Sequence, residues 1–373
     1  MSVYWNYRVR NISPYIPGEQ PRDRRFIKLN TNENPYPPSQ KVIEAIQKAA
    51  TADLRLYPDP ECIGFREAVA ARYGVKVEQV FAGNGSDEVL AFAFGAFFES
   101  RAAGGCPILF PDITYSFYPV YAKLWDIPYR VVPLNNDFSI EAARYTVPCG
   151  GAVFPNPNAP TGMAVSLSDI LIIAERFKQQ QRVLIIDEAY IGFGTAGEAD
   201  SAVPCIGEYP NLLTVHTLSK SASLAGLRAG FAIGDEALIE GLCRMRDSFN
   251  SYTLDRIALA GAAAAVSDSA YYNEINRRII ATRERVAKNL AEMGFFVLPS
   301  SANFIFAKAP GTSGAAFFSA LREKGILVRH FNKERIADYL RISIGTDEEM
   351  NVFLNACEAI KRNPPIPDLY HKE

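Results

Sequence analysis

The stretch Val183-Leu184-Ile185-Ile186-Asp187-Glu188-Ala189-Tyr190 decides the fold. Its apolar beginning predicts a short strand inside a sheet that helices cover. Two carboxylates follow directly, and ligands of open α/β sheets bind at the carboxyl ends of the strands. The stretch therefore predicts an α/β sheet with acidic groups at the mouth of a binding site. Asp187 could hold magnesium, cap a helix or pair with a cationic ring.

Other short apolar runs repeat this pattern, and stretches with helical spacing separate several of them. Such alternation is typical of a sheet covered by helices. We therefore predict a large domain with a mostly parallel sheet at residues 36–265. The strand-like runs lie at residues 108–110, 152–154, 212–215 and 230–233, and helical spacing is found at residues 39–50 and 64–73.

The two ends of the chain differ from this middle part. Residues 1–35 are rich in proline, asparagine and aromatic residues without a sustained period, which predicts an extended N-terminal arm. A long amphipathic helix at about 271–293 leads to strand-like runs at residues 303–307, 326–329 and 340–344. These features predict a smaller α+β domain over residues 266–373.

The composition excludes several classes of protein. With 48% hydrophobic residues, 21% charged residues and a net charge of -2, the 373-residue chain has no basic surface for nucleic acid. Its six cysteines stand singly, so we expect reduced cysteines and no metal site. No stretch resembles a signal peptide or the ~20 apolar residues of a membrane span. We expect a cytoplasmic protein with small-molecule partners or a second copy of itself.

The glycine-rich turn Gly83-Asn84-Gly85-Ser86-Asp87-Glu88 precedes a helical run. Free backbone N–H groups and the positive end of a helix dipole bind phosphate. Ser86 or Asp87 could equally be an ordinary N-cap. The turn alone therefore leaves both interpretations open.

The third motif is Thr217-Leu218-Ser219-Lys220, followed by Gly226-Leu227-Arg228-Ala229-Gly230. A lysine directly after an apolar strand can be desolvated, which lowers its pKa and favours Schiff-base formation. Ser219 and Arg228 add a hydroxyl and a guanidinium, which suit a phosphate. A solvated surface lysine is the ordinary alternative. Three such motifs in one order along one sheet argue against it.

These motifs resemble the fold-type I enzymes that depend on pyridoxal 5'-phosphate (PLP), and most closely the class II histidinol-phosphate aminotransferase family. The resemblance implies that fold, with the arm packed on the small domain and on a dimer partner. It rests on the three motifs and on further segments spread along nearly the whole chain. These are Asn11-Ile12-Ser13-Pro14-Tyr15, Leu29-Asn30-Thr31-Asn32-Glu33-Asn34-Pro35, Tyr57-Pro58-Asp59-Pro60, Pro160-Thr161-Gly162 and Leu340-Arg341-Ile342.

The resemblance also implies roles for individual residues. Lys220 would carry PLP as a Schiff base and then move the proton. Asp187 would pair with the pyridinium nitrogen, and Tyr190 would hydrogen-bond the ring 3-hydroxyl. Tyr115 would stack on the ring.

The cofactor phosphate has its own set of implied residues. The backbone around the glycine-rich turn and two side chains after Thr217 would bind it. Tyr57 would reach the phosphate of the neighbouring subunit, which implies a homodimer with shared active sites. The implied residues of the same subunit are Gly85, Ser86, Asp87, Ser219 and Arg228.

One position departs from the family pattern. The family has Asn directly before Pro-Thr-Gly, where it donates to the ring 3-hydroxyl, whereas this chain reads Asn156-Pro157-Asn158-Ala159-Pro160. Either Asn158 takes over that contact or Tyr190 makes it alone. We therefore keep Asn158 among the expected cofactor contacts.

The substrate side is implied by two arginines near the C-terminus. Arg341, helped by Arg329 and Tyr15, would bind the phosphate of histidinol phosphate, and the forked guanidinium would also accept a carboxylate of glutamate. Asn32 is also implied as a substrate contact. The resemblance thus implies amino transfer between L-histidinol phosphate and 2-oxoglutarate, giving imidazole acetol phosphate and L-glutamate in histidine biosynthesis.

Three alternatives stay open at this point. An aromatic amino-acid aminotransferase would share every cofactor residue. A threonine-phosphate decarboxylase, which is a lyase, would carry much the same motifs. A non-catalytic PLP-binding regulator would need a DNA-binding module, for which residues 1–35 are too short and too poorly periodic.

Overall fold

The computed structural model describes residues 2–20, 26–194 and 200–363. Its large sheet has seven strands in the order β2-β8-β7-β6-β5-β3-β4 within this described part. Strands β7, β6, β5, β3 and β4 run parallel, and β8 is antiparallel to both of its neighbours. The bounds are β2 (Val80–Gly83), β3 (Ile108–Pro111), β4 (Tyr129–Val132), β5 (Ala152–Pro155), β6 (Leu184–Asp187), β7 (Leu212–Thr217) and β8 (Gly230–Gly234).

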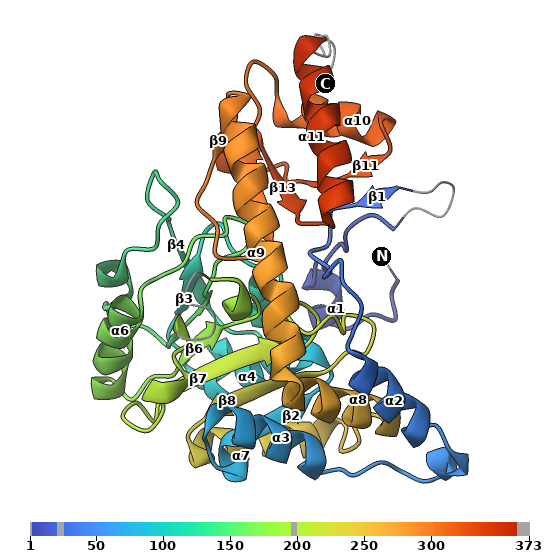
Figure 1. Cartoon of the computed structure of the whole chain (residues 1–373). Helices are drawn as coiled ribbons and strands as arrows, with labels where there is room; N and C mark the ends of the chain where they lie inside the picture. Colours follow the sequence, from blue (N-terminus) through green and yellow to red (C-terminus); the bar gives the residue numbers. More distant parts are fainter. Residues whose placement is uncertain (1, 21–25, 195–199, 364–373) are drawn as a thin grey trace.

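Helices cover both faces of this sheet (Figure 1). In β6, Ile185 packs with α4, α5 and α7, whereas Leu184 and Ile186 pack with α6 on the opposite face. The buried strand is apolar throughout because both faces are covered. The α-helices are α2 (Gln40–Ala49), α3 (Ile63–Tyr73), α4 (Gly85–Phe97), α5 (Tyr118–Leu124), α6 (Leu167–Gln179), α7 (Glu236–Phe249) and α8 (Arg256–Ser267). Short 3-10 helices are η1 (Ala52–Arg55), η2 (Val77–Gln79), η3 (Arg101–Ala103), η4 (Ala142–Tyr145), η5 (Ile191–Phe193), η7 (Val203–Cys205) and η8 (Glu334–Ile336).

The C-terminal part forms a second, smaller sheet, which is antiparallel and has the order β12-β13-β10-β9. Residues 27–28 of the N-terminal segment join this part, because β1 pairs in parallel with β11. The bounds are β1 (Ile27–Lys28), α9 (Ser269–Glu292), β9 (Phe296–Val297), β10 (Phe304–Lys308), α10 (Gly314–Glu323), β11 (Ile326–Leu327), β12 (Arg329–His330), β13 (Tyr339–Ser343) and α11 (Asp347–Arg362).

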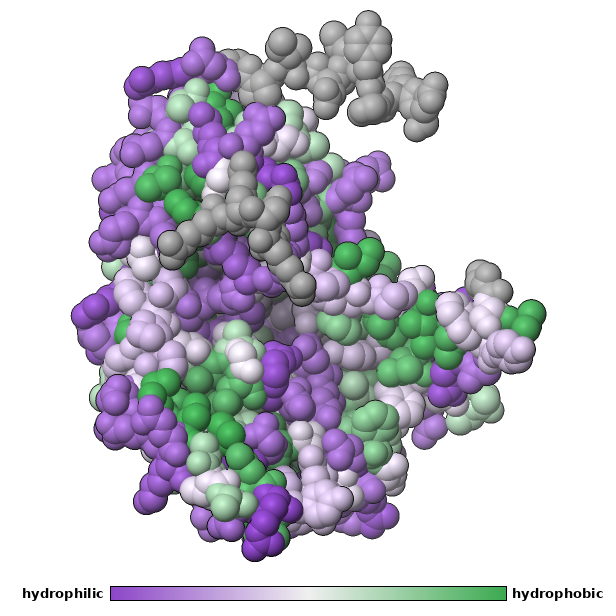
Figure 2. Space-filling view, turned by 90° about the vertical axis from the view of Figure 1, so that its right-hand side faces the viewer, coloured by the Kyte–Doolittle hydropathy of each residue, from purple (hydrophilic) through white to green (hydrophobic). Residues whose placement is uncertain are grey.

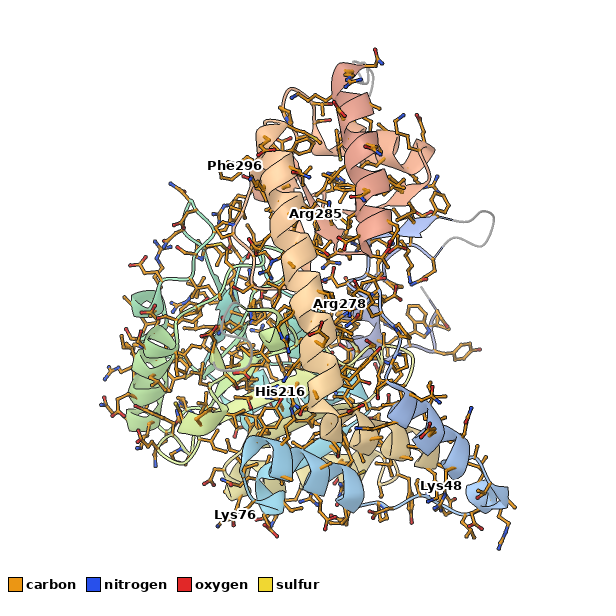
Figure 3. All side chains as sticks on the ribbon, viewed as in Figure 1. Lys48, Lys76, His216, Arg278, Arg285 and Phe296 are labelled. Carbon is orange, nitrogen blue, oxygen red and sulfur yellow. The ribbon has the colours of Figure 1, made fainter. Side chains whose placement is uncertain are left out.

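Helix α9 connects the two parts, as Figure 1 shows. Its first turns pack through Tyr272 and Ile275 with the core around α2, α3 and α8, whereas Val286 and Leu290 belong to the core of the small sheet. Arg278 and Arg285 lie along the same helix (Figure 3), and Arg285 forms an ion pair of 2.7 Å with Asp347 of α11. The division at residues 265/266 stays a prediction, and it falls near the end of α8.

The predicted fold class is confirmed, and the bounds of the strands and helices quoted above are confirmed to within two residues. Two features differ. The run predicted at residues 326–329 is divided into β11 and β12, which pair with β1 and with β13. The arm contains a short helix, α1 (Tyr7–Asn11), because the side chain of Asn6 accepts a hydrogen bond from the N–H of Val9 and caps it. Among the described residues, no helix combines the length and apolar character that crossing a membrane requires.

Candidate active site

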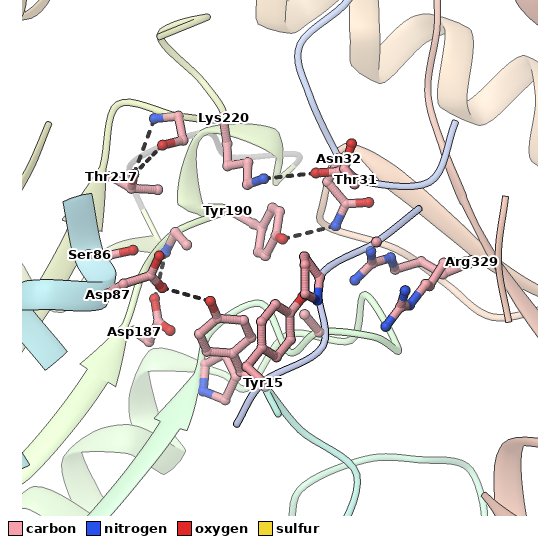
Figure 4. A pocket seen from close by; sticks show the side chains of 18 of the residues that line it. Tyr15, Thr31, Asn32, Ser86, Asp87, Asp187, Tyr190, Thr217, Lys220 and Arg329 are labelled. Atoms are coloured by element: carbon pink, nitrogen blue, oxygen red, sulfur yellow. Dashed lines mark hydrogen bonds between the residues drawn. The ribbon is translucent and has the colours of Figure 1, made fainter. Parts of the chain in front are cut away.

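A cavity opens where the large sheet, the small sheet and the N-terminal segment meet (Figure 4). Its empty space is about 950 Å³, open solvent included. The floor lies at the carboxyl ends of β6 and β7, as expected for an α/β sheet. The structure brings these predicted residues to its wall: Tyr15, Asn32, Ser86, Asp87, Tyr115, Asp187, Tyr190, Ser219, Lys220, Arg228, Arg329 and Arg341.

Asp187 ends β6 at the floor of the cavity. Its Oδ2 accepts a hydrogen bond of 3.0 Å from the hydroxyl of Tyr118, and its Oδ1 accepts one of 3.2 Å from the N–H of Ala189. Burial raises the pKa of this carboxyl to about 6, against the lowering effect of the Tyr118 hydrogen bond. No cation pairs with it within the described part of the chain. A cationic ring would therefore stabilise the ionised carboxylate.

Lys220 follows β7 and points across the cavity. Its Nζ donates a hydrogen bond of 3.0 Å to the backbone carbonyl of Thr31, which the N-terminal segment brings to the site (Figure 4). Burial, and after it the positive charge of the nearby guanidinium of Arg341, lower the pKa of Lys220 to about 8. The neutral amine, which is the form that a nucleophile requires, is therefore more populated near neutral pH than in an ordinary lysine.

The first turn of α4 forms a cradle with Arg228. Arg228 donates to the Oγ of Ser219 at 3.3 Å and to Oδ2 of Asp87 at 3.1 Å, and the hydroxyl of Tyr115 donates to Oδ1 of Asp87 at 2.7 Å. Gly85 does not line the cavity but sits beneath it, where φ is +76° and a Cβ would lie 2.8 Å from Nη2 of Arg228. Only glycine fits this turn, whose free N–H groups and guanidinium suit a phosphate.

The opposite wall carries two arginines on adjacent strands. Arg341 of β13 faces Arg329 of β12 in register. Arg341 donates to the carbonyl of Asn30 at 3.0 Å, and its buried Nε has no hydrogen-bond partner in the described residues. Burial lowers its pKa. Neither guanidinium forms an ion pair with a described carboxylate, so both remain available for an anion.

Tyr190 and Asn32 form the third wall. The side-chain amide of Asn32 donates to the hydroxyl of Tyr190 at 2.9 Å, and Asn32 is 1% exposed. The Tyr190 ring packs edge-on against Phe304, 5.2 Å between centroids. Asn32 thus lies at the cavity with its amide directed at Tyr190.

Besides Gly85, two predicted residues do not line this cavity. Asn158 is fully buried behind the wall, where its Nδ2 donates to the carbonyl of Ile113 at 3.0 Å and to the hydroxyl of Thr161 at 2.9 Å. Ala159 lines the cavity in its place. Tyr57 is 77% exposed and stacks on Tyr252, outside this cavity.

Sequence reasoning did not identify Tyr118 or the carbonyl of Thr31 as parts of the site. Tyr118 follows Tyr115 by three residues at the start of α5, and this spacing could have suggested a second aromatic contact. The carbonyl of Thr31 leaves no signal in the sequence, since every residue has one.

The residues present fit a cofactor with a phosphate at one end and a cationic ring. The α4 cradle offers the phosphate site, the unpaired carboxylate of Asp187 suits a ring cation, and Lys220 offers an amine for covalent attachment. Metal binding lacks comparable support. Within the described residues no group of three or more histidine, cysteine or acidic side chains could hold an ion.

Comparisons with known proteins agree with this geometry. Residues 24–357 match the family model "Aminotransferase class I and II". The chain is 51% identical over 363 residues to a histidinol-phosphate aminotransferase of Clostridium beijerinckii, covering 97% of this chain and 99% of that relative. It is 53% identical over 355 residues to one of Clostridium acetobutylicum, covering 95% of this chain and 98% of that relative.

Solved structures share the fold. The histidinol-phosphate aminotransferase from Sinorhizobium meliloti in complex with pyridoxal-5'-phosphate superimposes with a TM-score of 0.85 over 97% of this chain and 99% of that one, at 23% identity. A mutant aspartate aminotransferase of Thermus thermophilus gives a TM-score of 0.80 at 18% identity, covering 97% of this chain and 99% of that one. At these identities the likeness concerns the fold alone.

Proposed function

The chain belongs to the class I and II aminotransferase family and, within it, to the histidinol-phosphate aminotransferases, and from this premise we propose its reaction. It transfers the amino group of L-histidinol phosphate to 2-oxoglutarate, giving imidazole acetol phosphate and L-glutamate, a step of histidine biosynthesis. The observation that carries this proposal is the identity of 51–53% over nearly the whole chain to relatives of that name.

The cofactor is pyridoxal phosphate, which supplies when bound a pyridine ring that accepts electrons from the substrate α-carbon. We assign Asp187 to the ring nitrogen, where its carboxylate keeps a proton on that atom. Lys220 binds the cofactor covalently and afterwards moves a proton at the α-carbon. The lowered pKa of Lys220, caused first by burial, favours the neutral amine that accepts this proton.

The remaining cofactor contacts bind and orient. Ser86, Asp87, Ser219 and Arg228 hold the phosphate at the first turn of α4, where the hydrogen bonds of Arg228 fix the cradle before the ligand arrives. Tyr115 covers the ring. Because Ala159 offers only a methyl group to the cavity, Tyr190 is the side chain that donates to the ring oxygen.

Arg341 and Arg329 bind the anionic end of both substrates. A phosphate and a carboxylate both match the forked guanidinium. Since no described carboxylate neutralises either arginine, an anion entering the cavity replaces no internal ion pair. Tyr15 stacks on Phe117 with 4.4 Å between ring centroids and brings the arm over this end of the site. One pocket can therefore serve both halves of the reaction.

We further propose a homodimer with shared active sites. Tyr57 lies outside its own cavity, is 77% exposed and stacks on Tyr252, and Leu54 and Leu56 beside it are exposed as well. Figure 2 shows hydrophobic side chains gathered in patches on the lower half of the face that it draws. Exposed apolar patches mark interaction surfaces. In this dimer Tyr57 would contact the cofactor phosphate of the neighbouring subunit. We also expect this biosynthetic enzyme to be located in the cytoplasm.

A spectral titration of the purified, cofactor-loaded protein tests the reaction. L-histidinol phosphate, L-phenylalanine and L-threonine phosphate are added in turn, and the conversion of the cofactor to its amino form is followed by absorbance. Conversion by histidinol phosphate at the lowest concentration supports the proposal. A stronger response to phenylalanine would indicate an aromatic amino-acid aminotransferase, and release of CO₂ from threonine phosphate would indicate a decarboxylase.

A further inference from the structure

A buried hydroxyl of the small sheet fixes the orientation of one amide at the active site. The Oγ of Ser343 accepts a hydrogen bond of 2.8 Å from the backbone N–H of Asn32 and donates one of 2.9 Å to its Oδ1. Both residues are almost fully buried, at 2% and 1% exposure. Because Ser343 donates to the amide oxygen, the amide nitrogen of Asn32 must point the other way.

That nitrogen points at Tyr190. The distance from Nδ2 of Asn32 to Oη of Tyr190 is 2.9 Å. An amide NH₂ group only donates, so the tyrosine oxygen accepts here and keeps its own proton for another partner. In the described part of the chain no acceptor lies within hydrogen-bond distance of that proton. The hydroxyl is thus a donor directed at the cavity.

Ala159 and Asn158, the described residues nearest to the position where the family has its asparagine, offer no second hydrogen-bond donor at this wall. Ala159 contributes a methyl group to this wall, and the amide nitrogen of Asn158 already donates its hydrogen bonds to the carbonyl of Ile113 and to the hydroxyl of Thr161. The groups that face Tyr190 are the guanidinium of Arg341, the carboxylate of Asp187, the phenol of Tyr15 and the ring of Phe304.

We propose that Ser343 and Asn32 are positioning residues that make Tyr190 donate its proton to the ring oxygen of the bound cofactor. The inference rests on the proposed function, since it requires bound PLP. Residues 341 and 343 of β13 point to the same side of the strand. The strand that binds the substrate anion through Arg341 therefore also orients the donor to the cofactor.

We call the chain of hydrogen bonds from Ser343 through Asn32 to Tyr190 the relay. Asn32→Asp reverses the direction of its last hydrogen bond with little change in the shape of the side chain. The residue has φ +55°, a left-handed conformation that Asn and Asp adopt more readily than other residues. A carboxylate accepts where the amide donated, so the hydroxyl of Tyr190 turns toward residue 32. Loss of a donor to the ring oxygen raises the pKa of the nitrogen that links Lys220 to the cofactor, because that donor stabilises the oxygen anion left when the nitrogen loses its proton.

The measurement is the pH midpoint of the absorbance change of the bound cofactor. We expect a rise of about one pH unit in Asn32→Asp and a smaller rise in Ser343→Ala, which frees the amide to rotate. The new carboxylate also raises this midpoint by its charge, in the same direction as the nearby Glu33 and Asp87 act on the nitrogen of Lys220, whereas Arg341 and Arg228 act in the opposite direction. Both variants are therefore repeated in a Tyr190→Phe background, where a relay through Tyr190 predicts no further shift for Ser343→Ala and only the smaller shift due to charge for Asn32→Asp.

A matched control comes from Asn303, whose Nδ2 donates to the carbonyl of Asn32 at 3.0 Å without contacting Tyr190. Asn303→Ala should lower the thermal midpoint as Ser343→Ala does and leave the absorbance midpoint unchanged. A Ser343→Ala shift that persists in Tyr190→Phe, an Asn32→Asp shift of undiminished size in that background, or no shift in Ser343→Ala would overturn the relay. A wild-type protein without cofactor absorbance or amino transfer would instead overturn the proposed function.

Discussion

The buried carboxylate of Asp187 should make the cofactor-free protein less stable as the pH rises. Its pKa is raised from 3.8 to about 6 in the folded state, chiefly because burial disfavours the charge. The folded state therefore holds this proton more tightly than the unfolded chain does, so stability is present below pH 3.8 and is lost as the pH rises through 6. A shift of about two pH units corresponds to a loss of about 3 kcal/mol, of which about 1.5 kcal/mol remains to be lost between pH 5 and pH 8.

Asp187→Asn removes this titration. Without cofactor, we expect the stability of the variant relative to the wild type to rise by about 1.5 kcal/mol from pH 5 to pH 8. This corresponds to roughly 2 °C in thermal midpoint. With PLP bound the order should reverse, because removing one partner of a buried ion pair costs about 3–5 kcal/mol. Thermal unfolding followed by circular dichroism, with and without cofactor at both pH values, measures all four states.

The variant Tyr118→Phe tests whether the raised pKa of Asp187 causes this loss of stability. Tyr118 donates to Asp187 and lowers its pKa, so Tyr118→Phe should raise the pKa further and steepen the loss of stability with pH. An unchanged difference between Asp187→Asn and wild type at pH 5 and pH 8 would refute the argument that burial raises this pKa. So would an Asp187→Asn variant that PLP stabilises as strongly as it stabilises the wild type.

Three further outcomes follow from the site. Lys220→Ala should abolish the yellow absorbance of the covalently bound cofactor and all but a residual turnover, and near-native amino transfer would contradict its role. Arg341→Ala should raise KM for histidinol phosphate and for 2-oxoglutarate by at least about tenfold, since each loses a charge-assisted hydrogen bond; unchanged kinetics with both would remove that role. Mixed dimers of inactive Tyr57→Ala and inactive Lys220→Ala chains should recover part of the activity if sites are shared between subunits, and no recovery would argue against sharing.

Local sequence patterns were sufficient to predict much of the large sheet and the motifs at the carboxyl ends of its strands. The run at 183–186 is apolar because both faces of β6 are covered, and the acidic group follows where the strand ends. β4 (Tyr129–Val132) was missed because it lies at the edge of the sheet and exposes half of its residues. β2 (Val80–Gly83) was missed because its short apolar run merges into the glycine-rich turn that follows.

The partners of the site residues were harder to predict because they are distant in sequence. Tyr118 reaches Asp187 over 69 positions, Thr31 reaches Lys220 over 189, and Ser343 reaches Asn32 over 311. Propensity and periodicity describe neighbours within a few residues, whereas these contacts depend on how the two sheets pack. The residue types were therefore predictable, but the direction of each amide and hydroxyl was not.

The charges of the site explain how substrate binding and proton transfer are connected. Burial lowers the pKa of Lys220, and the unneutralised guanidinium of Arg341 lowers it further. An anion that binds Arg341 cancels part of this second effect, so the lysine becomes a stronger base when the substrate is in place. In the absence of substrate the same arginine helps to keep the pKa of the amine low, so that more of it is neutral and available for the cofactor than in an ordinary lysine. A neutral side chain at position 341 would therefore weaken anion binding and also remove the dependence of lysine basicity on the bound anion.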